Sequence, residues 1–262
     1  MSDAGTVRAS LVSAGCLLRS LPLFFLASPR TPLRVLGIVA LDTLHVLRHS
    51  RPMSRRRVRE LGMFLDFEGC ANAVWDQKAS HSDECLVIRT CLEEAGLGEC
   101  LSEYLSRLRA LESARPVIGG DYRCFDDVRP YRESVARLAL CTAAAIALNP
   151  DCRERDIRAA QDDNEVDTLF RILMQCQIID DVLDYAEDES AGLPSFLTAS
   201  GSLPQALALT AEAARYYALP SAHSGRGVFP LRVALHAFTM VTPLVLHVAG
   251  WRHRDARQVA HR

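Results

Sequence analysis

The stretch Gln175-Cys176-Gln177-Ile178-Ile179-Asp180-Asp181-Val182-Leu183-Asp184-Tyr185 combines an apolar run with three carboxylates. Its apolar residues follow a helical spacing rather than an alternating one, which predicts a helix. At about 100° per residue, Asp180 and Asp184 lie nearly in line, and Asp181 lies about 60° from Asp184. The surrounding Ile, Val and Leu residues favour a buried helix, where unpartnered carboxylates are costly. The cluster therefore predicts a Mg²⁺ site, and a solvated acidic helix end is the alternative.

Composition narrows the class of protein. The chain has 262 residues, of which 49% are hydrophobic, and a formal net charge of −2. This charge gives no reason to expect a nucleic-acid partner. The nine cysteines form no Cys-x-x-Cys pair, so a zinc ribbon is not expected and a reducing cytosol is the simplest setting.

The periodicity predicts an all-α protein built as a single-domain helical bundle. No alternating strand pattern or hairpin turn is present. We expect residues 1–50 to form an apolar, amphipathic extension and residues 51–262 to form the main domain. The helical patterns cover 7–28, 33–48, 58–78, two segments within 83–112, 128–148, a helix from Asp163 to near Glu187, 203–219 and 228–249.

Local signals predict where several helices begin or break. Ser54 is suited to cap the helix that follows it, and Asp162 and Asp163 are suited to cap the helix that carries the aspartates. The segment Gly96-Leu97-Gly98 predicts a break between two helices.

Two apolar segments raise the question of a membrane. Residues 7–28 contain arginines and a proline, which favours a bent amphipathic helix that packs on the domain or rests on a membrane surface. Residues 228–249 are also apolar, but they favour a core helix because polar residues and a proline interrupt them. These interruptions are Arg232, His236, Pro243 and His247.

A second helix offers partners for the aspartate cluster. Asn72 and Asp76 are i,i+4 neighbours just before a polar loop, so this helix could face the cluster across the mouth of a bundle. Asp66 lies roughly 15 Å further along the helix and could not share a metal with Asp76. An ordinary helix C-terminal turn is the alternative interpretation of Asn72 and Asp76.

A central apolar cavity with carboxylates at one end suits a long apolar chain that carries a diphosphate. Mg²⁺ between carboxylate and diphosphate oxygens would help the C–O bond to ionise, and arginines would contact the phosphates. The candidate arginines are Arg132, Arg137 and Arg171. Aromatic rings could stabilise a carbocation, although each could equally be core. They are Phe64, Phe67, Trp75, Phe170 and Tyr185.

The segment from Gln177 to Tyr185 resembles the second aspartate-rich motif of the trans-prenyl diphosphate synthases. The following Gly192-Leu193-Pro194-Ser195-Phe196-Leu197 is similar to the stretch after that motif in squalene and phytoene synthases. The resemblance, which covers the chain from about Arg55 onward, implies the all-α fold of the class I isoprenoid synthases and a Mg²⁺-dependent prenyl diphosphate substrate. It implies Asp180, Asp181 and Asp184 as metal ligands, with Gln177 and Tyr185 near the substrate.

The chain departs from this family at the first motif. Adjacent aspartates are replaced by Asn72-x-x-x-Asp76, and the Gly-Gly-Lys segment of chain-elongating enzymes is absent, as is the asparagine-serine-glutamate metal motif of terpene cyclases. The expected function is ionisation of a prenyl diphosphate followed by cyclisation, coupling or quenching, with Asp76, Asp180 and Asp181 as catalytic residues.

Two alternatives belong to other classes of protein. One is a non-catalytic subunit or prenyl-lipid-binding partner with the same fold. The other is a membrane-embedded prenyltransferase. We expect a cytoplasmic protein, with association at a membrane surface through residues 7–28 and a homodimer as open alternatives. Prenyl chain length and product do not follow from the sequence.

Overall fold

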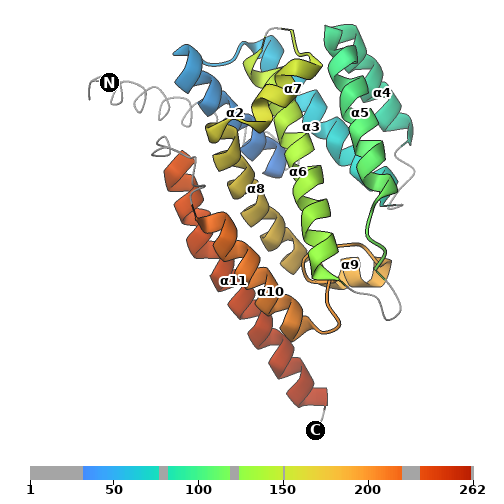
Figure 1. The fold of residues 1–262 in the computed structure, drawn as a ribbon, viewed down its shortest axis with the longest axis vertical. Helices are drawn as coiled ribbons and strands as arrows, with labels where there is room; N and C mark the ends of the chain where they lie inside the picture. Colours follow the sequence, from blue (N-terminus) through green and yellow to red (C-terminus); the bar gives the residue numbers. More distant parts are fainter. Residues whose placement is uncertain (1–31, 77–81, 119–123, 150, 220–230, 261–262) are drawn as a thin grey trace. The chain divides into compact units, whose positions relative to one another are not determined.

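The fold is described from a computed structural model, which covers residues 32–76, 82–118, 124–149, 151–219 and 231–260 (Figure 1). These residues form helices and contain no strand, so the expected all-α class is confirmed. The predicted helix over residues 7–28 lies outside the described residues. By their contacts, the described residues divide into two compact units, which share helices α5, α6 and α8. The expected domain boundary at residue 50 stays a prediction.

Unit 1 comprises the described residues up to Leu108 together with Leu138–Val166. It holds α2 (Pro32–His49), α3 (Arg55–Trp75), α4 (Ser82–Leu92), a π-helical turn (Glu93–Leu97), most of α5 (Gly98–Ser113), the end of α6 (Phe125–Leu148) and α7 (Glu154–Gln161). Helix α3 packs against both α2 and α4. Its buried rings Phe64 and Phe67 meet Tyr104 of α5 edge to face, which places an aromatic core beside α3.

Unit 2 comprises Arg109–Arg137 and the described residues from Asp167 onward. It holds the first half of α6, most of α8 (Asn164–Leu183), α9 (Tyr185–Ala191), α10 (Leu203–Ala218) and α11 (Leu231–Ala260). Helices α10 and α11 lie side by side (Figure 1). Gln175 of α8 donates to the carbonyl of Ala214 at 2.8 Å, and Tyr217 of α10 donates to Glu133 of α6 at 2.6 Å. These buried polar contacts tie three helices of unit 2 together.

The predicted caps at Ser54 and Asp163 and the predicted break are confirmed, whereas Asp162 is the C-cap residue of α7 and does not cap α8. The Ser54 hydroxyl accepts from the Arg57 amide at 3.3 Å. The Asp163 carboxylate accepts from the amides of Glu165 and Val166, both at 3.0 Å. Gly96 has φ 89°, a conformation that favours glycine and separates α4 from α5.

The helix with the aspartates ends earlier than expected. Helix α8 stops at Leu183, and Asp184 is the N-cap residue of the short helix α9. Leu183 is 73% exposed, so this end of the helix is not buried all round. The expectation of a buried aspartate cluster is therefore wrong for Asp180 and Asp184, which are exposed, and it holds for Asp181.

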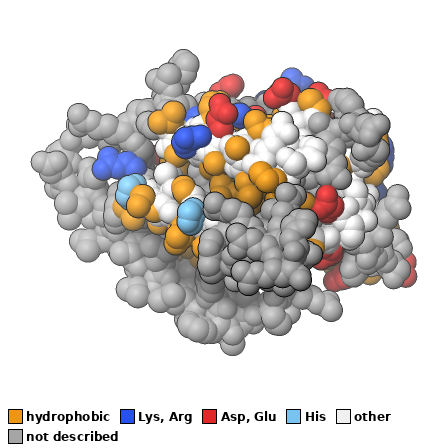
Figure 2. Space-filling model, turned by 90° about the horizontal axis from the view of Figure 1, so that it is seen from below, with side chains coloured by type: hydrophobic (Ala, Val, Ile, Leu, Met, Phe, Trp, Pro, Cys, Tyr) orange, Lys and Arg blue, Asp and Glu red, His pale blue; other side chains and the backbone are white. Residues whose placement is uncertain are grey.

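Helix α11 is not the core helix that we expected. Leu231–Gly250 is long and apolar enough to cross a membrane, but only 11% of this window is buried. The buried residues Leu231, Thr242 and Leu246 fall on one arc of the helix. Large apolar side chains are exposed on the opposite arc, at Val233, Met240, Val241, Leu244 and Val248. Figure 2 shows hydrophobic side chains exposed together on one face of the molecule.

Candidate functional site

The aspartate-rich end of α8 holds carboxylates in very different surroundings. Asp180 and Asp184 are exposed, whereas Asp181 is only 3% exposed. Asp188, one turn into α9, is also buried. No sequence pattern predicts the burial of Asp188. Glu187, Asp188 and Glu189 form an acidic run of the kind that usually faces solvent.

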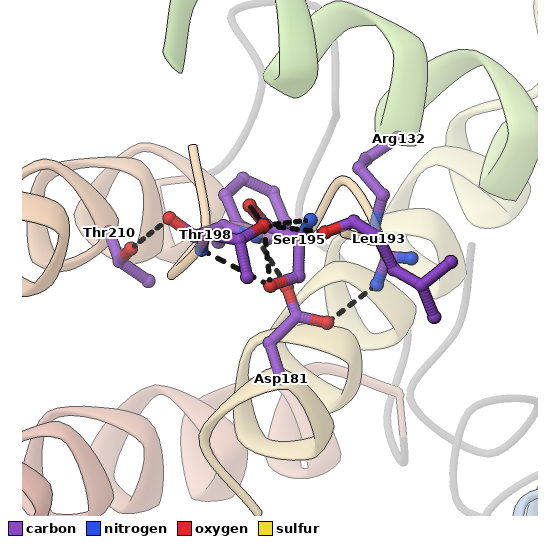
Figure 3. A network of polar contacts seen from close by, with 7 residues as sticks. Arg132, Asp181, Leu193, Ser195, Thr198 and Thr210 are labelled. Atoms are coloured by element: carbon purple, nitrogen blue, oxygen red, sulfur yellow. Dashed lines mark hydrogen bonds and ion pairs between the residues drawn. The ribbon is translucent and has the colours of Figure 1, made fainter. Parts of the chain in front are cut away.

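Both oxygens of Asp181 accept hydrogen bonds (Figure 3). Arg132 of α6 donates to Oδ1 at 2.7 Å, and the backbone amide of Phe196 donates to Oδ2 at 2.7 Å. Asp181 therefore joins α6, α8 and the segment after α9 in a charge-assisted contact. We call this contact the Asp181 network.

Hydroxyl groups also form hydrogen bonds with the backbone of the segment after α9, which contacts Asp181. The Thr198 hydroxyl donates to the carbonyl of Leu193 at 2.6 Å and accepts from the Ser195 amide at 2.8 Å. Thr210 of α10 donates to the carbonyl of Phe196 at 3.3 Å (Figure 3). Residues 194–200 are buried without forming a helix, so these contacts satisfy backbone groups that would otherwise be costly.

Burial sets the charge state of Asp181. Removal from water raises the pKa of its carboxyl to about 6, while Arg132 and the Phe196 amide oppose the rise and the nearby Asp188 and Asp180 add to it. The carboxyl is thus ionised at neutral pH and becomes protonated in mild acid.

The three candidate arginines have different partners. Arg132 is the one that meets the aspartate cluster, and its buried Nε has no hydrogen-bond partner among the described residues. Arg171 pairs instead with Asp167 at 2.9 Å. Arg137 pairs with the same carboxylate at 3.3 Å, and its guanidinium lies 3.8 Å from the ring centre of Phe170. Their phosphate-binding roles stay predictions.

The other expected substrate-binding residues are spread over both units. Gln177 is half-buried, and its Oε1 has no hydrogen-bond partner among the described residues. Tyr185 begins α9 and is also half-buried. Phe67 lies in unit 1, where it is buried against Tyr104. Its contact is that of a core residue.

The residues expected to face the cluster belong to unit 1. Asn72 donates to Glu68 at 2.6 Å. Asp76 follows α3 as its C-cap residue, and its amide donates to the carbonyl of Asn72 at 2.8 Å. Asp66 pairs with Arg34 at 3.1 Å. The Asp180 cluster belongs to unit 2, so the two-sided metal site stays a prediction.

The donor set fits a metal ion only in part. Asp180 and Asp184 offer exposed carboxylates one helical turn apart, and oxygen ligands of this kind suit Mg²⁺. Asp181 does not fit the role in this arrangement, because each of its oxygens already accepts a hydrogen bond. Among the described residues, no group of three or more His, Cys, Asp and Glu side chains is arranged to hold a metal.

Comparison of the chain with protein-family models, with curated proteins and with solved structures returned no match.

Proposed function

We propose that this protein is a Mg²⁺-dependent enzyme of isoprenoid metabolism with the class I isoprenoid synthase fold, which ionises a prenyl diphosphate and cyclises, couples or quenches the resulting cation. One observation carries the proposal. Arg132 reaches the aspartate-rich end of α8 and retains a buried Nε without a hydrogen-bond partner among the described residues. Arginine beside carboxylates is the combination that recognises a metal-bound diphosphate.

In this proposal each residue of the site has its own role. Asp180 and Asp184 would hold the metal, which when bound would neutralise the diphosphate leaving group. Arg132, whose side chain is partly exposed, would place its positive charge beside the diphosphate while its Nη2 remains on Asp181. Asp181 would then position Arg132 instead of binding metal itself. Gln177 would offer Oε1 as an additional polar group on the same helix.

Asp180→Ala tests the enzyme directly. We expect diphosphate release from a series of prenyl diphosphates with Mg²⁺ to fall by at least about tenfold, because a metal ligand is lost. Asp180 is exposed, so the variant should unfold at the same temperature as the wild type. Glu212→Ala removes another exposed carboxylate, on α10, and should release diphosphate at the wild-type rate.

The same assay addresses the non-catalytic alternative. The hydrogen bonds on both oxygens of Asp181 favour that alternative, since they give this aspartate a structural role. A binding subunit would release no diphosphate from any chain length and would show no Mg²⁺-dependent thermal shift with inorganic diphosphate. That pair of results would refute the enzyme. The homodimer stays an untested expectation.

For localisation, we propose that α11 lies on a membrane surface. Its exposed apolar arc is opposite the arc that packs in unit 2, and His236 and His247 lie beside it rather than within it. Arg252, Arg254 and Arg257 follow the apolar stretch in sequence, as expected for contact with anionic headgroups. This arrangement favours a peripheral protein over a membrane-embedded one.

Leu244→Glu should weaken binding to vesicles that contain anionic lipid by about tenfold or more, because a charge replaces a side chain on the apolar arc. Co-sedimentation in high salt measures the bound fraction. Val87→Glu places the same charge at an exposed apolar residue of α4 and should bind like the wild type. Full solubility of the wild type with vesicles present, or equal loss in both variants, would exclude this role of α11.

A further inference from the structure

Unit 1 holds two buried cysteine side chains that contact each other. Cys100 lies in the first turn of α5 and is 1% exposed, and Cys152 lies between α6 and α7 and is 5% exposed. Both thiols are free, and they are in hydrogen-bonding contact. Two sulfur atoms that already touch need only a short approach, to about 2 Å, to form a covalent bond. The fold therefore brings together a pair of thiols from segments that are remote in sequence.

A second contact joins the same two segments. Arg107 of α5 pairs with Glu154, the first residue of α7, at 3.7 Å. Arg107 follows Cys100 by about two helical turns and lies on the same side of α5. Glu154 closely follows Cys152 in the chain. The side of α5 that carries Cys100 therefore packs toward the start of α7, as the contact between the thiols requires.

The segment that carries Cys152 is held on both sides. Before it, Arg57 of α3 donates from Nη1 to the carbonyl of Ile146, near the end of α6, at 2.9 Å. After it, the amide of Arg153 donates to the carboxylate of Asp156 at 2.9 Å. A backbone that is already fixed has little conformational entropy left to lose when its side chain is linked to a neighbour.

We propose that Cys100 and Cys152 form a disulfide when the protein meets a peroxide, and that this bond joins α5 to the segment between α6 and α7. Cys152 reacts first, since it is the more exposed thiol and lies between the exposed residues Asp151 and Arg153. Its sulfur attacks hydrogen peroxide, the O–O bond breaks, and a sulfenic acid and water form. The Cys100 sulfur then attacks the sulfenic sulfur and displaces a second water. Two thiols and one peroxide thus give one disulfide and two waters.

The surroundings of Cys152 make this disulfide slow to form and hard to reduce. Hydrogen bonding to Cys100 raises the pKa of the Cys152 thiol above its ordinary value, and burial adds to the rise. Asp156 raises this pKa further, whereas Arg57 opposes the rise. A thiol with a raised pKa is a poor leaving group, so its disulfide reacts slowly with attacking thiols. The pair suits a lasting crosslink rather than a rapid redox sensor.

The crosslink stabilises the fold because it closes a loop of roughly 50 residues and restricts the unfolded chain. We expect the unfolding temperature to rise by at least about 4 °C on oxidation. The pair lies in unit 1 and uses no residue of the Asp180 cluster. The proposal therefore goes beyond the proposed reaction and does not depend on it.

Peroxide treatment of the folded full chain tests the bond. The remaining thiols are alkylated in urea, and digests made without reduction are analysed by mass spectrometry. We expect a peptide that links Cys100 to Cys152, and a rise in the unfolding temperature that prolonged treatment with dithiothreitol reverses. Reduction of the link should be at least about tenfold slower in the folded protein than in urea, because burial keeps the reductant from both sulfur atoms.

Two variants serve as comparisons. Cys152→Ala removes one partner and should show neither the link nor the rise in unfolding temperature. Cys91→Ala removes an exposed thiol of α4 and should behave like the wild type.

Three results would overturn the proposal. The first is absence of the linked peptide from folded wild type at a peroxide dose that oxidises Cys91 completely. The second is an equal yield of the link in folded and urea-unfolded protein, and the third is an unfolding temperature that does not rise in the linked protein. The wild-type measurements decide the outcome even if Cys152→Ala does not fold. Diphosphate release is not a readout, so failure here leaves the Mg²⁺-dependent reaction untouched.

Discussion

Asp181→Ala is expected to lower the free energy of unfolding by about 3 kcal/mol at neutral pH. The substitution leaves the Arg132 guanidinium without its partner and leaves the buried amide of Phe196 without an acceptor. Removing one member of a buried pair costs more than the pair itself contributes, since the remaining group stays desolvated. Urea unfolding followed by circular dichroism measures the change.

Asp180→Ala is the matched control for this prediction. The neighbouring carboxylate is exposed, so its removal should leave stability within about 0.5 kcal/mol of the wild type. If both variants lost a similar free energy of unfolding, the loss would come from removing a charge in the cluster and not from breaking the buried contact. If Asp181→Ala lowered the free energy of unfolding by less than about 1 kcal/mol, the Asp181 network would not stabilise the fold as proposed.

The same pair of variants reveals a pH dependence. The pKa of Asp181 is raised to about 6 in the folded protein, above the ordinary value of 3.8. The folded state therefore holds this proton more tightly, and the resulting stability is complete below about pH 4 and lost as the pH rises through 6. We expect Asp181→Ala to lower the free energy of unfolding by about 1 kcal/mol more at pH 5 than at pH 7. If Asp181→Ala destabilised the protein more at higher pH, this result would contradict the raised pKa of Asp181.

Arg171→Met is expected to lower the free energy of unfolding by about 2–4 kcal/mol. Arg171 is 9% exposed and pairs with Asp167 at 2.9 Å. Its Nη1 also donates to the carbonyl of Tyr216 at 3.2 Å and to that of Leu219, at the end of α10. Helix ends leave carbonyls short of partners, and the carbonyl of Tyr216 has only the Leu219 amide at 3.3 Å besides, so one arginine bonds both carbonyls while joining α8 to α10. Methionine retains the apolar packing of the side chain and removes the donors.

Arg171→Lys separates charge from geometry. A lysine keeps the positive charge but lacks the planar fork that contacts a carboxylate and a helix end together, so it should recover less than half of the loss. Arg215→Met, at an exposed position of α10, should be close to neutral. If Arg171→Met were as stable as the wild type, Arg171 would be available for the ligand-binding role expected from the sequence.

Local features of the fold followed from short stretches of sequence. Ser54 and Asp163 cap their helices as predicted, because a capping side chain bonds to amides two or three residues away. The break at Gly96 follows from the conformational freedom of that single residue. The end of α8 was predicted too late, since the run from Val182 to Glu187 contains no glycine or proline to mark the change at Asp184.

The candidate site depended on contacts between remote segments. Arg132, Arg137 and Arg171 were equivalent candidates in the sequence, and only packing selects Arg132 for a carboxylate 49 positions away. The same packing takes Arg137 to Asp167, whereas Arg171 reaches that carboxylate within α8 as an i,i+4 pair.

The sequence by itself determined an all-α protein, the positions of most of its helices and the presence of an acidic helix end. These properties arise from interactions within a few residues, namely apolar periodicity, side-chain caps and glycine conformations. The tertiary structure decided that Asp181 is buried while Asp180 and Asp184 are exposed, and that α11 presents an apolar arc outward. Burial depends on which remote segment covers a side chain, and Phe196 and Arg132 reach Asp181 only when the helices of unit 2 pack together.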